Sequence, residues 1–340
     1  MQEPELSVII PVMNIENRIC DVLNTLKEDT KGFSVEFLII DRGSKDKTMQ
    51  MALRFLRQNQ LNGYVMQESG GNISQTLNAG IQYANGTYIT FVFPQRIYQS
   101  YLEEFLKKAK ETNAEFLFGC KRQEQLKFAD LRSTSSVIKQ LTGVDYVECM
   151  ITHSMIPDAG AVVVSNQFLQ NHKIWFNENN TCRYGEDFVY KCFLAANHLA
   201  QVAVVMQVDD EKSVLLNQNH TSQDIFAPFE EVEGLLRTLV FLQKQYSHHE
   251  KMIKLFMQQK IPETVMQIIE GLLKQKVKPR AIRSYMHKKG YDRLLIIGPY
   301  TPHTLKVKIT TWRYFPRFYR LCNKCYKNRR LTACFCFIFQ

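Results

Sequence analysis

The sequence predicts an α/β protein with a doubly wound, mostly parallel sheet and a helical appendage at its C-terminal end. Two short apolar runs rich in β-branched residues, 6–12 and 37–40, flank one helix-sized interval, and a polar turn closes each run. This pattern indicates the first β-α-β unit of a sheet that is buried on both faces. Strand-like and helix-like segments then alternate to about residue 206, as in a doubly wound sheet. From about residue 226 the pattern is only helical.

The remaining elements follow in order along the chain. Further strands are expected at 63–66, 88–93, 114–119, 159–164 and 199–206, and helices at 49–59, 73–84, 98–111, 185–197, 230–245, 248–259, 262–275 and 279–288. Pro262 and Pro279 are expected at helix starts, where a missing N–H costs nothing. Residues 120–157 lack periodicity, which is typical of a segment that folds over a site. We predict an α/β domain over 1–225, a helical region over 226–300 and a basic aromatic tail over 301–340.

The first two turns of the chain are expected to form one wall of a pocket. Residues 11–14 follow the first strand, and residues 41–44 follow the second. Ligands of parallel sheets bind at the carboxyl ends of the strands, and these ends lie at one edge. A nucleotide would therefore bind beside these two turns.

Motifs at these turns are similar to those of a known family. Pro11-Val12-Met13-Asn14 ends the first strand, and Asp41-Arg-Gly-Ser-Lys-Asp-Lys-Thr48 ends the second. The likeness continues at Gly70-Gly-Asn-Ile-Ser74, Asn78-Ala-Gly80, Asn85-Gly-Thr-Tyr-Ile-Thr-Phe91 and Gly185-Glu-Asp187. Over roughly residues 6–210 the chain thus resembles the nucleotide-binding half of glycosyltransferase family 2, whose members are inverting enzymes with a GT-A fold.

This resemblance implies a set of donor-binding residues. Asp41 would accept a hydrogen bond from a uracil imide, which implies a UDP-sugar donor. The other implied donor-binding residues are Pro11, Val12, Asn14, Gly43, Ser44, Gly71 and Asn78. The alternative for Asp41 is a turn residue that accepts bonds from the N–H groups of its own loop.

Two acids at the start of a later helix carry the implied chemistry. The family places its general base at the pair that corresponds to Glu186-Asp187. An inverting transfer needs a carboxylate that takes the proton of the acceptor hydroxyl while its oxygen attacks the anomeric carbon. Asp187 is the implied base, and Glu186 would position the base or the acceptor. The alternative is that both are first-turn acids favoured by the helix dipole.

The chain departs from the family where a metal would bind. The family has Asp-x-Asp after an apolar strand and usually uses Mn²⁺ or Mg²⁺, whereas this chain has Phe93-Pro-Gln-Arg96. Arg42 replaces the second Asp of the earlier turn, and Leu77 stands where an Arg often meets the phosphates. We therefore assign no metal ligands and leave the cofactor open. Arg42 or Arg96 is expected to contact the donor phosphates, with Lys121 and Arg122 as further candidates.

Positive charge is concentrated at the C-terminal end. The formal net charge is +10, and ten of the 43 Lys and Arg residues but no acid follow Asp292, so the preceding part balances 33 basic against 33 acidic residues. Residues 313–321 interleave basic and aromatic side chains, and 331–339 are apolar. Contact with an anionic membrane surface is favoured over a merely solvated tail. Nucleic acid is not an expected partner, because no nucleic-acid-binding module is present.

Cysteine usage and hydropathy bear on location. The nine cysteines form no repeating framework, and no signal-like apolar core precedes Leu6, which favours a reducing cytoplasm. Cys322 and Cys325 lack a second pair at zinc-finger spacing. No apolar run approaches the roughly 20 residues of a membrane span. The expected location is the cytoplasm, peripheral at the inner face of the cell membrane.

These features predict a glycosyltransferase of the hexosyl-transferring, inverting type. It would move a sugar from a nucleotide-sugar donor to a glycan or lipid-linked acceptor in surface polysaccharide assembly, a step that the resemblance alone implies. The alternative is a non-catalytic GT-A-like module that binds glycan or a partner glycosyltransferase. Loss of Asp-x-Asp favours this module, whereas retention of Gly185-Glu186-Asp187 favours the enzyme.

Overall fold

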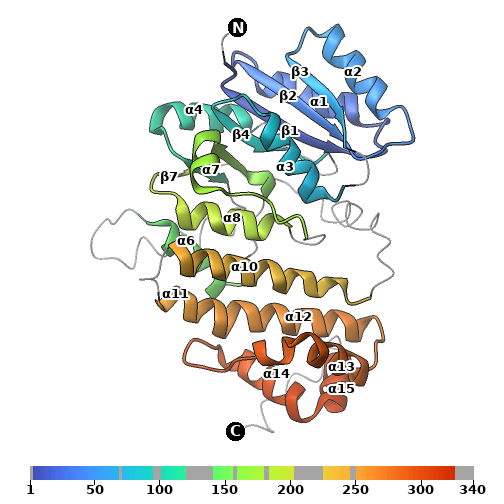
Figure 1. Ribbon diagram of the computed structural model, residues 1–340, viewed down its shortest axis with the longest axis vertical. Helices are drawn as coiled ribbons and strands as arrows, with labels where there is room; N and C mark the ends of the chain where they lie inside the picture. Colours follow the sequence, from blue (N-terminus) through green and yellow to red (C-terminus); the bar gives the residue numbers. More distant parts are fainter. Residues whose placement is uncertain are drawn as a thin grey trace. The chain divides into compact units, whose positions relative to one another are not determined.

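The computed structural model describes residues 3–68, 71–94, 101–119, 141–155, 159–179, 184–202, 225–245 and 250–325 (Figure 1). The chain divides into two compact units, residues 1–221 and 222–340. The first unit contains a sheet with helices, and the described part of the second unit is helical.

A seven-stranded sheet forms the centre of the first unit, in the order β3-β2-β1-β4-β6-β5-β7. Its strands are β1 (Leu6–Val12), β2 (Val35–Asp41), β3 (Gly63–Gln67), β4 (Tyr88–Phe91), β5 (Phe116–Gly119), β6 (Val162–Ser165) and β7 (Leu199–Val202). β6 runs antiparallel to both of its neighbours, and the other paired strands are parallel. The predicted mostly parallel sheet is confirmed. The strand order reverses between β1 and β4, which is where ligands of such sheets bind.

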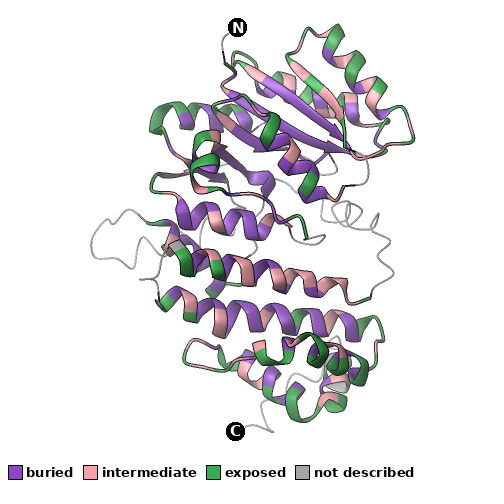
Figure 2. Ribbon diagram, in the orientation of Figure 1, coloured by how far each residue is buried: buried purple, intermediate pink, exposed green. Residues whose placement is uncertain are grey.

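Helices cover both faces of this sheet (Figure 1). On one face α1 (Ile19–Asp29), α2 (Thr48–Gln58) and α4 (Leu102–Thr112) share an apolar cluster with Val8 and Ile10 of β1. On the other face α3 (Ile73–Tyr83) packs so closely that a Cβ at Gly80 would lie 2.5 Å from Ile9 Cγ2. All seven residues of β1 are buried, which explains why all of them except Ser7 are apolar (Figure 2).

Three more helices complete the described part of the first unit: α6 (Gly143–Thr152), α7 (Asn166–His172) and α8 (Tyr184–Ala195). α6 and α8 pack against each other. At the start of α6 the fit is so close that a Cβ at Gly143 would overlap the carbonyl of Phe193 near the end of α8. The C-terminal end of α8, the helix whose first turn contains the predicted catalytic acids, is therefore held against α6.

A buried carboxylate, that of Glu36, links segments near the amino ends of β1 and β2. Glu36 is 1% exposed, and its Oε1 accepts hydrogen bonds from Ser7 Oγ at 2.5 Å and from the Asn85 N–H at 2.7 Å. The Gly86 N–H in turn donates to Ser7 Oγ at 2.8 Å. Every link satisfies a buried polar atom, so this network has a structural role.

The second unit is built around one central helix. Its α-helices are α10 (Glu230–Gln245), α11 (Glu250–Leu255), α12 (Ile261–Lys274), α13 (Pro279–Lys289), α14 (His303–Tyr314) and α15 (Pro316–Cys325), with short 3₁₀ turns at Ala227–Phe229 and Tyr291–Leu294. α12 contacts α10, α13, α14 and α15. Leu305, Ile309 and Trp312 are buried, so packed helical structure continues past residue 300.

A π-helical turn, Phe256–Lys260, joins α11 to α12. Pro262 lies at the start of α12, as the sequence predicted, but the preceding π-helical turn makes the helical run continuous over 250–274. Proline has no N–H to donate to the carbonyl of Gln258 four residues before it. Thr301 Oγ1 donates to that carbonyl at 2.6 Å instead. The wide turn and the Thr301 hydroxyl together accommodate the proline.

Membrane-spanning structure is not found in the described ranges, since none of their helices has both the length and the apolar character that a span needs.

Candidate active site

The first two turns lie side by side at the carboxyl edge of the sheet. Asn14, whose φ is 50°, donates its N–H to Ser44 Oγ at 2.9 Å, and its Oδ1 accepts from the Lys45 N–H at 2.8 Å. The Arg42 N–H donates to the Val12 carbonyl at 3.0 Å. Pro11 and Val12 are buried in β1. The expected wall beside the strand ends is therefore formed by two loops that bind each other.

Asp41 ends β2 and is fully buried. Its Oδ2 accepts from the Gly43 N–H at 3.1 Å and the Ser44 N–H at 2.9 Å, and its Oδ1 accepts from Ser44 Oγ. Gly43 has a φ of 87°, a conformation that side chains rarely adopt. Asp41 thus accepts bonds from its own loop, which is the role weighed above as the alternative. Recognition of a base by Asp41 stays a prediction.

Arg42 places a guanidinium beside the same strand end. Its Nε is buried and has no hydrogen-bond partner among the described residues. Burial lowers the pKa of Arg42, and the nearby Tyr184 acts in the opposite direction. The Tyr184 ring in turn lies 6.0 Å from the Phe93 ring. Arg42 therefore lies where the ends of β2 and β4 meet the start of α8.

The end of β4 does not fit a divalent ion. Phe93, which stands where the family has the first carboxylate of Asp-x-Asp, and the neighbouring Pro94 are both buried and offer no side-chain oxygen. Within the described ranges, no group of three or more His, Cys, Asp or Glu side chains could hold a metal. Gln95 and Arg96 lie outside the described residues, as do Lys121 and Arg122.

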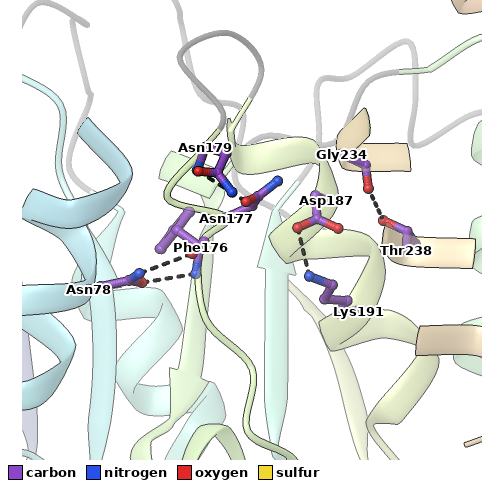
Figure 3. Close-up of polar contacts among 8 residues, drawn as sticks. All are labelled: Asn78, Phe176, Asn177, Asn179, Asp187, Lys191, Gly234 and Thr238. Atoms are coloured by element: carbon purple, nitrogen blue, oxygen red, sulfur yellow. Dashed lines mark hydrogen bonds and ion pairs between the residues drawn. The ribbon is translucent and has the colours of Figure 1, made fainter. Parts of the chain in front are cut away.

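Asn78 of α3 clamps the segment that leads into α8 (Figure 3). Its Nδ2 donates to the Phe176 carbonyl at 3.0 Å and its Oδ1 accepts from the Phe176 N–H at 2.9 Å. Nδ2 also donates to Glu178 Oε1 at 3.0 Å. Both amide donors of Asn78 are thus used within the protein. Gly71, another predicted donor-binding residue, is half-buried just before α3.

Aromatic packing then fixes the start of α8. The rings of Phe176 and Phe188 are stacked with centroids 4.1 Å apart. Phe91 of β4 meets both rings edge-on, at 5.0 Å and 5.4 Å. The helix that carries the predicted base is thereby tied to the strand end where the nucleotide is expected.

Glu186 and Asp187 lie in the first turn of α8 and are 4% and 1% exposed. Lys191 Nζ lies 2.7 Å from Asp187 Oδ2, one turn along the helix (Figure 3). The sequence reading missed Lys191, although its i,i+4 spacing from Asp187 was available. Burial raises the pKa of the adjacent Cys192 thiol well above its ordinary value, so this cysteine stays protonated and is not a nucleophile.

Residues 7–142 match the sequence model of the family described as Glycosyl transferase family 2. This segment belongs to glycosyl transferase family 2. Curated relatives match part of the same length: Glycosyltransferase GlyA of Streptococcus pneumoniae serotype 4 is 30% identical over 118 residues, which are 34% of this chain and 17% of GlyA. Uncharacterized glycosyltransferase EpsJ of Bacillus subtilis strain 168 is 28% identical over 117 residues, 34% of this chain and 33% of EpsJ. The chain thus spans a third or less of these two family 2 relatives.

The fold is also found in solved structures. The crystal structure of residues 1–349 of Staphylococcus aureus TarS in complex with UDP-GlcNAc has a TM-score of 0.57 and 17% identity, and the match covers 95% of this chain and 91% of that one. A likeness at this identity establishes the fold. The first unit has the GT-A fold that the resemblance implied.

Proposed function

We propose that this chain transfers a hexosyl group from a UDP-sugar to a glycan or lipid-linked acceptor, with inversion. The observation that carries the proposal is the placement of buried Asp187 at the start of α8, in a chain whose residues 7–142 belong to glycosyl transferase family 2. The TarS structure with the same fold contains UDP-GlcNAc, which supports a UDP-linked donor.

The donor would bind across the point where the strand order reverses, between β1 and β4. The loops at Asn14 and at Gly43-Ser44 would hold the nucleoside, with Asp41 toward the base. Pro11 and Val12 would form the floor of this donor site. Because Asn78 bonds the backbone of Phe176, its contribution would be to position the segment beneath the donor.

Arg42 would stabilise the departing diphosphate. Cleavage of the sugar–phosphate bond leaves negative charge on the diphosphate, and fixed cationic donors can stabilise that charge. The buried Nε of Arg42 lacks a partner in the described structure, and a phosphate oxygen would satisfy it. The sequence after β4, Phe93-Pro-Gln-Arg96, contains no carboxylate pair that would repel such a donor. Arg96 is a second candidate for this role.

Asp187 would act as the general base. It would take the proton of the acceptor hydroxyl as that oxygen bonds to the anomeric carbon, while the bond from that carbon to the diphosphate oxygen breaks on the opposite face. Lys191, at 2.7 Å, would hold the carboxylate in position, and Glu186 would orient the acceptor. Attack opposite to the leaving group inverts the anomeric centre.

The acceptor would belong to surface polysaccharide assembly. TarS of S. aureus strain Mu50 carries the name poly(ribitol-phosphate) β-N-acetylglucosaminyltransferase, and it is 28% identical over 89 residues, 26% of this chain and 16% of TarS. The exposed rings of Tyr314 and Phe315 near Arg317 support contact of the C-terminal tail with an anionic membrane. The protein would then work in the cytoplasm at the inner face of the cell membrane.

A second candidate function is that of a non-catalytic GT-A-like module, which binds glycan or a partner glycosyltransferase. The observation that favours it is the sequence after β4, where Gln95 and the buried Phe93 replace the family's two carboxylates. Such a module would bind a nucleotide sugar weakly or not at all, and it would release no nucleoside diphosphate from it.

Calorimetric titration of the full chain with a panel of nucleotide sugars tests the donor class. Specific binding of one uridine-linked sugar, with weaker binding of the guanosine and cytidine analogues, is the expected result. Failure of every nucleotide sugar to bind would contradict the transferase proposal and support the binding module.

A further inference from the structure

The helical unit contains a cavity of about 690 Å³ that the donor site does not explain. Its walls come from α13, the turn after α13, and the junction of α14 and α15. The apolar lining includes Met286, Leu295 and Trp312, and the first and last of these are only 1% and 3% exposed. The cavity therefore has an apolar floor within a folded core.

Arginines dominate the polar lining of this cavity: Arg280, Arg283, Arg313 and Arg317. Asp292 is the one acid among the lining residues, and it is already paired with His287, with 3.2 Å between Oδ2 and Nδ1. That bond holds the pKa of Asp292 below its ordinary value. The arginines outnumber the acid four to one.

These arginines are not neutralised within the described structure. No ion pair with a described carboxylate is formed by Arg280, Arg283 or Arg317. Arg313 donates from Nη2 to the Leu295 carbonyl at 2.8 Å, which fixes its planar group at the cavity wall without neutralising it. Four guanidinium charges around one hollow repel each other unless an anion lies between them.

We infer that this cavity is a binding site for a phosphate ester, a phosphate group that carries an organic substituent. A guanidinium offers two parallel N–H bonds to phosphate oxygens, and several arginines can share one tetrahedral anion. The volume exceeds that of a bare phosphate, and the apolar floor at Met286 and Trp312 would contact the substituent. The site uses residues of the second unit alone, so its test is independent of the donor site.

Two sources of a phosphate ester fit this chemistry, a water-soluble ester and a lipid headgroup. The exposed rings of Tyr314 (67%), Phe315 (64%) and Phe318 (43%) adjoin Arg313 and Arg317 in sequence, as at a membrane-facing surface. One arm of the experiment therefore titrates the full chain with sn-glycerol 3-phosphate at physiological ionic strength. The other measures flotation with phosphatidylcholine vesicles that do or do not contain phosphatidylglycerol.

Two double variants of equal charge separate a site from general attraction. Arg283→Ala with Arg317→Ala removes two lining arginines, whereas Lys288→Ala with Lys289→Ala removes two exposed lysines of α13 that do not line the cavity. The arginine pair should weaken binding at least about tenfold, and the lysine pair should leave it nearly unchanged. Glycerate, which carries a carboxylate in place of the phosphate, should bind more weakly than glycerol 3-phosphate.

If the arginine pair of substitutions weakens binding of glycerol 3-phosphate, the ligand is a soluble ester. If it weakens only flotation with phosphatidylglycerol vesicles, the ligand is a lipid headgroup. Either result supports the site. Three results overturn it: no binding in either arm, equal losses in the two double variants, or glycerate binding as tight as that of glycerol 3-phosphate. Far-UV circular dichroism of both variants checks that the helices remain folded.

Discussion

Lys191 Nζ lies 2.7 Å from Asp187 Oδ2, and the two side chains are only 13% and 2% exposed. Lys191 lies one turn after Asp187 along α8, and Asp187 shares the first turn of this helix with Glu186. A carboxylate so enclosed needs a cation or several hydrogen bonds, because removal of a charge from water is costly. Lys191 therefore belongs to the support of the proposed base, although it carries no proton in the proposed reaction.

Lys191→Met should destabilise the protein by about 3 kcal/mol, because it leaves Asp187 buried without its cation. Chemical denaturation measures the change. The matched control is Lys107→Met, which breaks an exposed i,i+4 pair with Glu103 and should destabilise the protein far less. Equal costs for the two variants would show that the Asp187 pair contributes no more than a surface pair.

Asp41→Asn should weaken UDP-sugar binding by roughly 1.5–3 kcal/mol, since it replaces a charged acceptor with an amide. Thr48→Val is the control, because it removes a hydroxyl that orders the same turn by accepting from the Ile15 N–H at 2.8 Å, and it keeps the Asp41 carboxylate. Calorimetric titration of both folded variants makes the comparison. If the two variants bind alike, the role of Asp41 is to order its loop, and base recognition must be assigned elsewhere.

Arg42→Met should weaken donor binding by about 1.5–3 kcal/mol, and Arg42→Lys should restore only part of the loss because an ammonium cannot make two parallel bonds. Lys45→Met, an exposed neighbour in the same loop, should have little effect. Donor binding by the unmodified chain should also persist in excess chelator. Binding that requires Mn²⁺ or Mg²⁺ would contradict the assignment of Arg42.

Thr301→Val should destabilise the helical unit by about 1–2 kcal/mol, since it removes the hydroxyl that donates to the Gln258 carbonyl. In a Pro262→Ala background this cost should shrink, because an N–H becomes available at residue 262. A double-mutant cycle followed by thermal unfolding measures the coupling. Independent effects of the two substitutions would show that Thr301 does not compensate for the proline.

The strand-end half of the site could be predicted because it is local. The apolar runs and their turns place Asn14, Asp41 and Ser44 at one edge of the sheet before any contact is known. The direction of β6 could not be predicted in this way, because Val162–Ser165 is a short buried run that suits parallel and antiparallel pairing alike.

Long-range contacts are the part that the sequence does not display. The amide of Asn78 meets the backbone of Phe176, 98 residues later, and no local pattern marks that pair. Pro262 followed the usual rule for helix starts, but tertiary packing supplied Thr301 and let the helical run continue. The arginine cavity likewise joins residues from three helices whose separate patterns indicate only basic surface.

We propose above that Asp187 takes the acceptor proton in a transfer from a nucleotide sugar. The most direct test is the release of nucleoside diphosphate from the donor found by titration, with acceptor present, for the unmodified chain and for Asp187→Asn. If Asp187 is the base, the unmodified chain turns over and the variant loses about 10²–10⁴-fold in rate, with donor affinity nearly unchanged. A variant that turns over at the unmodified rate would contradict this role of Asp187.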